Sequence, residues 1–338
     1  MNRRIYILYT GGTIGMQRSA DGYVPMAGLA DLINEKIPLH LSASVPEYHL
    51  EELDTLIDST NATPADWRRI AAKVVDNYAN YDGFIILHGT DTLAYTASAL
   101  SFMLQGLQKP VIITGSQIPL SELRNDALDN LITALVLARN YPVAEVCLYF
   151  SGRLLRGNRA TKLKATGFDA FDSPNYPWLG KVGINIEMEQ ANIRPPSTAG
   201  EQFELPHYDK RVVPLRLYPG IDADYLRHVL QLPMDGLILE SFGVGNAPDR
   251  DPELLRLLDQ ANSRGLVTVN LSQCLYGRVD LSSYATGSAL ARTGVIGGAD
   301  MTMEATFAKL HHLLMTESSA ARVRDLMATD ICGELTPA

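Results

Sequence analysis

A glycine-containing segment near the N-terminus places hydroxyl groups where a reaction could occur. Thr10-Gly11-Gly12-Thr13 directly follows the short apolar run Ile5–Tyr9. Consecutive glycines let the backbone approach a ligand closely and can point amide hydrogens at an oxyanion. Thr13 stands where a nucleophilic hydroxyl would lie, although a structural turn alone would also explain the glycines. The spacing fits neither a phosphate-binding P-loop nor a dinucleotide-binding loop, which disfavours a nucleotide-dependent oxidoreductase.

A second polar segment, His88-Gly89-Thr90-Asp91-Thr92, follows the apolar run Gly83–Leu87. Capping of the next helix would explain either Thr90 or Asp91, but it does not require both. These two residues therefore join Thr13 as candidates for catalysis. His88 titrates near neutrality and could act as a base. A histidine that closes a buried strand is more often hydrogen-bonded scaffold, and we favour that interpretation.

A third segment, Arg156 to Lys164, carries two lysines that could assist a hydroxyl nucleophile. A hydroxyl is a weak nucleophile near neutral pH and needs a base, and a buried lysine can cooperate with a threonine and an aspartate in that role. Lysines in loops are usually solvated charges, so composition alone does not choose between Lys162 and Lys164. A Ser-His-Asp triad is not indicated, because the chain has no Gly-x-Ser-x-Gly elbow.

The composition disfavours several other classes of protein. The 338 residues carry a formal net charge of -9 without a basic stripe, so nucleic acid is not an expected partner. Cys147, Cys274 and Cys332 are too few and too scattered for a disulfide framework, and they lack the spacing of a zinc site, so we expect no metal. The N-terminal apolar run is too short for a signal peptide or a membrane span, which favours a soluble cytoplasmic protein.

The elements that must position these residues follow a pattern typical of an α/β protein. Short apolar runs are followed by segments with helical periodicity, as in a doubly wound, mainly parallel sheet with flanking helices. Ligands of such sheets gather beyond the carboxyl ends of the strands, where Thr13 and Thr90 are expected. The clearest strands are predicted at 5–9, 83–87, 111–114 and 146–150, and helices at 90–104 and 124–139.

The chain exceeds the usual length of one domain, and we expect two. Polar residues and prolines without a sustained period indicate a linker at 191–211. It separates a larger N-terminal domain, 1–190, from a smaller C-terminal α/β domain, 212–338. In the second domain, strands are predicted at 212–217, 236–239 and 266–271, and helices at 222–230 and 252–264. Further helices are predicted to finish the chain from about 303 to 326.

Taken together, these motifs resemble the asparaginase and glutaminase family, and the resemblance to its bacterial type I, cytoplasmic branch covers nearly the whole chain. The most specific motifs are TGGTIG at 10–15 and GFIILHGTDTLAYTASAL at 83–100. The others are LIDST at 56–60, TGSQIPL at 114–120, RGNRATK at 156–162, FDSPN at 171–175, SFGVGNAP at 241–248 and YATG at 284–287.

The resemblance implies an amidohydrolase that converts L-asparagine to L-aspartate and ammonia without a cofactor. By motif position, Thr13 resembles the family's nucleophile and Tyr23 its partner on a mobile lid. Thr90, Asp91 and Lys162 resemble the second catalytic group, which links a hydroxyl, a carboxylate and an amine. Whether Thr13 forms an acyl ester or Thr90 activates water directly stays open.

The resemblance also implies how the substrate is held and how the protein assembles. Asp58 and Ser59 resemble the pair that grips the α-amino and α-carboxylate groups of the substrate. Thr60, Gly89 and Ser116 complete the implied substrate-binding set, together with Thr90 and Asp91. The implied assembly is a homodimer, or a homotetramer made of two intimate dimers. Cooperative control by asparagine is not predicted, because Glu240 stands where type I enzymes often carry a basic side chain.

Three alternatives stand beside this hypothesis. A glutaminase-preferring amidohydrolase would use the same chemistry. A non-catalytic amino-acid sensor would be expected to have lost Thr13, Thr90, Asp91 or Lys162, and none of them is missing. The D subunit of the archaeal amidotransferase that makes glutaminyl-tRNA has an additional N-terminal domain, which is not expected here because few residues precede the TGGTIG motif.

Overall fold

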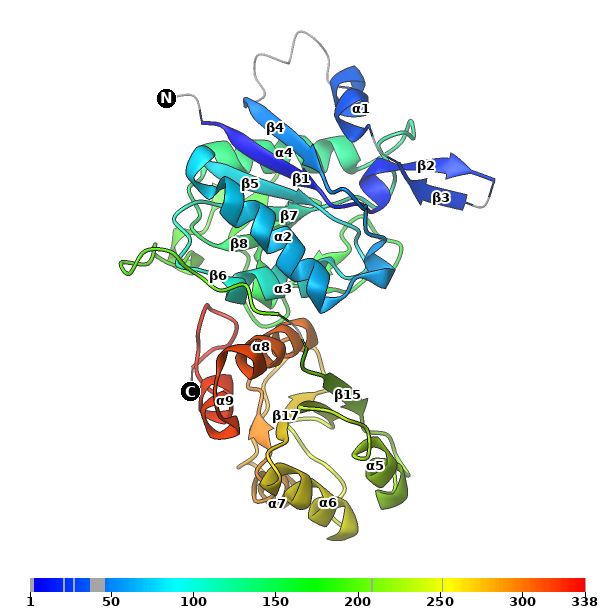
Figure 1. Ribbon diagram of the computed structural model, residues 1–338, viewed down its shortest axis with the longest axis vertical. Coiled ribbons are helices and arrows are strands. Elements are labelled where there is room, and N and C mark those ends of the chain that lie inside the picture. The colour runs from blue at the N-terminus through cyan, green and yellow to red at the C-terminus, as the bar shows by residue number, and fades with distance from the viewer. Residues whose placement is uncertain are drawn as a thin grey trace. The chain divides into compact units, whose positions relative to one another are not determined.

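Two units of different length make up the chain, and they divide between Leu205 and Pro206 (Figure 1). The computed structural model describes residues 3–20, 22–26, 28–36, 46–207, 209–250 and 252–337. The division falls inside the stretch 191–211 that the sequence suggests as a linker. Part of that stretch is attached to the first unit, because β14 (Gln202–Phe203) pairs antiparallel with β6 (Leu104–Gln105).

A mainly parallel sheet forms the centre of the first unit, as predicted. Neighbouring strands run parallel from β8 to β4, and the remaining strands are antiparallel. Across the sheet the described strands are β13 (Ile186–Met188), β12 (Gly180–Val182), β9 (Arg153–Arg156), β8 (Val146–Phe150), β7 (Val111–Thr114), β5 (Gly83–Leu87), β1 (Ile5–Tyr9) and β4 (Tyr48–Glu52).

The four strands predicted from the sequence for this unit, β1, β5, β7 and β8, have the predicted bounds. Each is buried along its whole length, which is why each reads as a continuous apolar run. No such apolar run marks β4, whose residues Tyr-His-Leu-Glu-Glu are mostly half-buried because the strand lies at the edge of the sheet.

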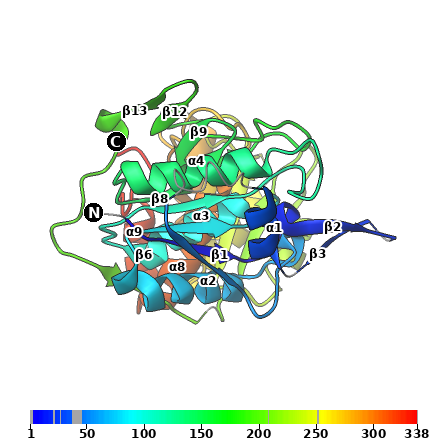
Figure 2. The same cartoon turned by 90° about the horizontal axis from the view of Figure 1, so that it is seen from above.

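Helices cover both faces of this sheet (Figure 2). α1 (Leu29–Lys36) and α4 (Ala127–Asn140) pack on the face that presents the buried side chains of Ile5, Ile7 and Ile85. α2 (Pro64–Asn77) and α3 (Leu93–Met103) contact each other on the opposite face. The sheet is therefore buried on both sides, and its strand ends are left as the place where loops can gather.

Both helices predicted in this unit begin three residues later than predicted. α3 starts at Leu93, because Thr90 and Asp91 lie in a turn where their side chains bind Lys162. α4 starts at Ala127. The residues before each helix thus belong to loops at the carboxyl ends of β5 and β7, where their side chains are available for chemistry.

The second unit holds a smaller parallel sheet, ordered β15 (Val212–Arg216), β16 (Gly236–Ser241), β17 (Val267–Ser272) and β18 (Ile296–Gly297). Successive residues of a strand point to opposite faces, so Leu237 and Leu239 enter one core and Ile238 the other. The first face is covered by α5 (Ala223–Val229), α6 (Pro252–Ser263) and α7 (Ala285–Ala291). α8 (Met303–Thr316) and α9 (Ala320–Met327) cover the second.

The predicted α/β fold is confirmed for both units, and so are the helices predicted from about 303 to 326, which are α8 and α9. α9 begins as a separate helix because Ser319 caps it by accepting a hydrogen bond from the amide of Arg322. None of the described helices is both long enough and apolar enough to cross a lipid bilayer.

Two short antiparallel pairs in the first unit carry site residues. β2 (Met16–Ser19) and β3 (Gly22–Pro25) form a hairpin that projects from the unit in both views (Figures 1 and 2). β10 (Thr161–Lys162) pairs with β11 (Phe171–Asp172). Single 3₁₀ turns, η1 (Thr13–Gly15) and η3 (Ser59–Asn61), follow the loops after β1 and β4.

Candidate active site

The loop after β1 lies against the loops after both neighbouring strands, and its two glycines make this possible. The carbonyl of Thr10 accepts a hydrogen bond of 2.7 Å from the amide of Ile57, in the loop after β4. A Cβ atom on Gly11 would lie 2.3 Å from the Ile57 carbonyl oxygen. A Cβ atom on Gly12 would lie 2.3 Å from both the Cα and the amide nitrogen of Gly89. Both glycines also have positive φ, so only glycine fits at either position.

Three loops converge at Gly89. A Cβ atom on Gly89 would lie 2.4 Å from the hydroxyl oxygen of Ser59 and 3.3 Å from the Cα of Gly12. Thr13 follows Gly12 and Thr90 follows Gly89, so each hydroxyl residue stands next to the contact between the two loops. Residues 13, 59, 89 and 90, which come from three predicted motifs, are thereby brought to one end of the sheet.

Asp58 lies at the N-cap of η3 and is held by Thr60. Its carboxylate accepts hydrogen bonds from the amide of Thr60, at 3.2 Å, and from the hydroxyl of Thr60, at 2.7 Å. The hydroxyl of Thr92 donates to the carbonyl of Ser59 at 2.8 Å, which fixes this loop to the start of α3. The Asp58 carboxylate is exposed and can receive a cation, whereas the hydroxyl of Thr60 is already committed to holding it.

Lys162 connects the two polar residues that precede α3. Its ammonium group donates to the hydroxyl oxygen of Thr90 at 2.9 Å and to the carboxylate of Asp91 at 2.7 Å. The hydroxyl of Thr90 in turn donates to the side-chain oxygen of Gln117 at 3.3 Å. Thr90 is 6% exposed. Asp91 therefore binds an amine and is not the N-cap of α3, which is Thr92.

The strand that carries Lys162 is braced from one side. β11 pairs with β10, and Asp172 of β11 accepts hydrogen bonds from the indole of Trp178, at 2.7 Å, and from Arg153, at 3.1 Å. Lys164, the other candidate lysine, forms an exposed ion pair with Asp169 instead. The structure thus brings Lys162 to Thr90 and Asp91 and leaves Lys164 on the surface.

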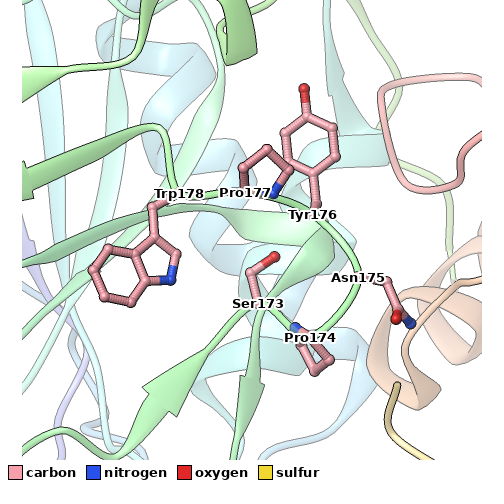
Figure 3. A pocket seen from close by; sticks show the side chains of 6 residues that line it. All are labelled: Ser173, Pro174, Asn175, Tyr176, Pro177 and Trp178. Atoms are coloured by element: carbon pink, nitrogen blue, oxygen red, sulfur yellow. The ribbon is translucent and has the colours of Figure 1, made fainter. Parts of the chain in front are cut away.

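A hollow of about 530 Å³ opens beside this brace, lined by Ser173, Pro174, Asn175, Tyr176, Pro177 and Trp178 (Figure 3). The labelled side chains spread away from one another in Figure 3. The hydroxyl of Tyr176 donates to the carbonyl of Asn192 at 2.9 Å, and the indole of Trp178 is bound to Asp172. The lining brings no base to a nucleophile, so this loop supports β11.

His88 closes β5 as part of the scaffold. It is 1% exposed, and its Nδ1 lies 2.8 Å from the carbonyl of Gly89, which requires Nδ1 to donate. Nε2 is then the acceptor for the hydroxyl of Thr96, at 3.0 Å. Burial lowers the pKa of His88, which favours this neutral form. The residue therefore orients the Gly89 peptide.

Tyr23 lies on the β2–β3 hairpin, and its hydroxyl is not bound to Thr13. It donates to the carboxylate of Glu122 at 2.6 Å, in the loop after β7. This hydrogen bond raises the pKa of Tyr23. Glu122 was absent from the sequence-based candidates, because it lies in a turn with no periodic pattern, although it follows the TGSQIPL motif closely.

The loop after β7 holds one predicted site residue, Ser116, and one that the sequence-based candidates omit, Gln117. Ser116, a predicted substrate contact, is fully buried and its hydroxyl has no hydrogen-bond partner. Its neighbour Gln117 contacts Thr90 and also donates to the carbonyl of Gly167 at 3.0 Å. The position of Gln117 directly after a buried parallel strand was a signal that could have identified it.

The arrangement suits acyl transfer from a carboxamide. A half-buried threonine, Thr13, lies on one glycine loop, and the other loop carries Thr90 and Asp91, which the amine of Lys162 on β10 joins. The hydroxyl of Thr13 can attack a carbonyl carbon, and the linked side chains of Thr90, Lys162 and Asp91 can move a proton. Exposed carboxylates at Asp58 and Asp91 favour a substrate that carries an ammonium group.

Comparisons with known proteins find similar sequences and structures over nearly the whole chain. The chain matches the family model for Asparaginase, N-terminal, at residues 4–194 and that for the Glutaminase/Asparaginase C-terminal domain at 211–327. It is 51% identical to L-asparaginase 1 of Escherichia coli K12, covering 99% of this chain and 98% of the relative. It is 41% identical to the mouse 60 kDa lysophospholipase, covering 99% of this chain and 63% of that protein. The solved structure of L-asparaginase I from Vibrio cholerae matches with a TM-score of 0.91 and 47% identity, covering 99% of this chain and 100% of that chain.

Proposed function

Since this chain belongs to the asparaginase family, we propose that it hydrolyses the side-chain amide of L-asparagine to L-aspartate and ammonia. The observation that supports the proposal most strongly is the bond of Lys162 to both Thr90 and Asp91, next to the contact between Gly12 and Gly89. In this proposal the group transfers protons beside the loop that carries the second threonine, Thr13.

In the proposed reaction, the hydroxyl oxygen of Thr13 attacks the carboxamide carbon of the substrate. Ammonia leaves, an ester forms on Thr13, and water then hydrolyses the ester to release aspartate and restore the hydroxyl. Thr90, with Lys162 and Asp91, exchanges the protons that these steps require. Backbone amides around Gly89 and Thr90 stabilise the oxyanion, which is worth about 3 kcal/mol for a well-aimed donor.

The backbone-like end of the substrate is held by the loop after β4. Asp58 receives the α-ammonium group, and Ser59 binds the α-carboxylate. Thr60 supports Asp58, because its amide and hydroxyl both donate to that carboxylate. Tyr23 covers the site from the hairpin.

We also propose that the enzyme is cytoplasmic, uses no cofactor and assembles as a homodimer or a homotetramer. Light scattering would distinguish the two assemblies.

Release of ammonia from asparagine, from glutamine and without substrate tests this proposal, and release of fatty acid from lysophosphatidylcholine tests the activity that the mouse relative's name suggests. We expect asparagine to give the fastest release of ammonia.

Thr13→Ala should lower kcat by roughly 1,000-fold without changing folding, whereas Thr13→Ser keeps a hydroxyl and should retain part of the activity. Near-normal turnover by the alanine variant would remove Thr13 from the mechanism.

A further inference from the structure

The bond between Tyr23 and Glu122 joins the projecting hairpin to the body of the first unit. The hydroxyl of Tyr23 donates to the carboxylate at 2.6 Å, a length typical of a hydrogen bond to an ionised acceptor. Tyr23 is 43% exposed, and its neighbours Val24 and Met26 are also exposed. The packing of these side chains is therefore limited, and the hydrogen bond to Glu122 contributes much of the orientation of the Tyr23 ring.

Glu122 itself stands on a well-anchored loop. The side-chain amide of Asn125 donates to the backbone carbonyl of Glu122 at 2.7 Å. The side-chain oxygen of Asn125 accepts from the amide of Ala127 at 3.1 Å, which fixes the loop to the first turn of α4. Asp126, the N-cap of α4, accepts from the amide of Gln117 at 2.9 Å. Glu122 therefore belongs to the same rigid loop that reaches Thr90 through Gln117.

The base of the hairpin is attached to this loop as well. The amide of Leu120 donates to the carbonyl of Ile14 at 3.1 Å, and the hydroxyl of Ser121 donates to the carbonyl of Met16 at 3.1 Å. Ile14 directly follows Thr13. One loop thus touches the segment of the proposed nucleophile, the start of β2 and, through Glu122, the ring on β3.

We propose that Glu122 is a positioning residue for the reaction, and that it acts by fixing Tyr23 and the β2–β3 hairpin beside the loop that contains Thr13. This inference rests on the proposed function, because it assigns Glu122 a part in the same site. Glu122 touches neither substrate nor reacting atoms in this scheme. The Glu122 carboxylate fixes the position of the Tyr23 ring, so removal of the carboxylate should lower kcat more than it changes KM.

Two measurements on the full-length protein test the inference. Glu122→Ala should lower kcat for asparagine by roughly 10- to 100-fold with little change in KM, since a small misplacement of a catalytic group has an effect of that size. Glu122→Gln keeps an acceptor oxygen and should recover part of the loss. Tyr23→Phe should lower kcat by a similar factor, and the Tyr23→Phe, Glu122→Ala double variant should be no worse than either single variant.

The second measurement does not depend on activity. Arg18 is exposed on β2, opposite Tyr23 in the hairpin, so trypsin can cut there once the hairpin is released. Glu122→Ala should be cut after Arg18 several-fold faster than the parent protein. Glu187→Gln, which alters an exposed glutamate on β13, is the matched control and should change neither readout.

The outcomes separate the two proposals. A parent protein that releases no ammonia from asparagine, while Glu122→Ala still accelerates cleavage, would refute the proposed function and leave the hairpin attachment standing. Unchanged kcat in Glu122→Ala would overturn the positioning role, whatever the cleavage rate. Losses that multiply in the double variant, or a fall in kcat without faster cleavage, would show that Glu122 does not act through Tyr23 and the hairpin.

Discussion

Lys162 and Lys309 form ion pairs of nearly equal length in opposite environments. Lys162 lies 2.7 Å from Asp91, and the two side chains are 19% and 55% exposed. Lys309 in the second unit lies 2.6 Å from Glu334, and both side chains are fully buried. Distance alone would make the two pairs equivalent, so the surroundings must decide what each does.

The surroundings of Lys309 leave no group free to react. Its ammonium also donates to the carbonyls of Met327, at 3.1 Å, and Thr329, at 2.6 Å. Glu334 accepts from the amides of Ile331 and Cys332. Burial alone would raise the pKa of Glu334, but Lys309 and the backbone donors outweigh it and hold that pKa below its usual value. The pair fixes the chain that follows α9.

Lys162 differs because one of its partners is a hydroxyl and because solvent reaches the pair. Its contact with Thr90 can be exchanged for a contact with a substrate or a water molecule at little cost, since Asp91 is more than half exposed. A buried pair is costly to break, whereas a partly exposed pair contributes little to stability. Lys162 is therefore suited to chemistry and Lys309 to structure.

The two lysines should differ most in how their removal changes turnover. Lys162→Met should lower kcat for asparagine by roughly 1,000-fold, because in the proposed reaction Thr90 exchanges its proton with this amine. The free energy of unfolding should change by less than about 1 kcal/mol. Steady-state ammonia release and urea denaturation measure the two quantities.

Lys164→Met is the matched control for Lys162→Met. Lys164 pairs with Asp169 on the surface, and activity should stay within about twofold of the parent protein. Equal losses in the two variants would break the assignment of Lys162. A large loss of stability in Lys162→Met would instead make it a structural lysine like Lys309.

The next effect is on stability. Lys309→Met leaves the Glu334 carboxylate buried without its cation, which should lower the free energy of unfolding by about 3–5 kcal/mol. Adding Glu334→Leu should restore most of that loss. Both tryptophans, Trp67 and Trp178, lie in the first unit, so circular dichroism is needed to report the second. The folded variant should keep the parent kcat, and a selective loss of kcat would contradict the comparison.

The sequence predicts a strand or a site residue when the segment that contains it has a pattern of its own. The strands β1, β5, β7 and β8 were predictable because each is wholly buried and reads as an apolar run. Thr13, Thr90 and Asp91 were identifiable because they follow two of those runs. The edge strand β4 and the contact made by Glu122 were not, since neither has a pattern within its own segment.

The choice between Lys162 and Lys164 shows a different limit. Residues two apart point to the same side of an extended chain, so periodicity treats the two lysines alike. What separates them is tertiary: Lys162 lies on β10 opposite Phe171, whereas Lys164 is close enough to Asp169 to form an ion pair. Within the sequence, only the resemblance to a family distinguishes Lys162 from Lys164.

The smallest predicted effect concerns two buried histidines in the helix that carries Lys309. Burial lowers the pKa of His311 and of His312 to about 4, because a charged imidazole is poorly solvated there. In the unfolded chain both titrate near 6.5. The unfolded state then binds protons that the folded state does not, so stability is complete above that pH and falls as the pH drops.

Between pH 7 and pH 5.5, each histidine should lower the free energy of unfolding by about 1 kcal/mol. This amount requires only that both rings remain neutral in the folded state over that range. Urea denaturation followed by circular dichroism measures the slope of stability against pH. A His311→Gln, His312→Gln variant should have a flatter slope, whatever its absolute stability. An unchanged slope would show that these rings take up protons without unfolding, and that the helix around Lys309 tolerates charge as the surroundings of Lys162 do.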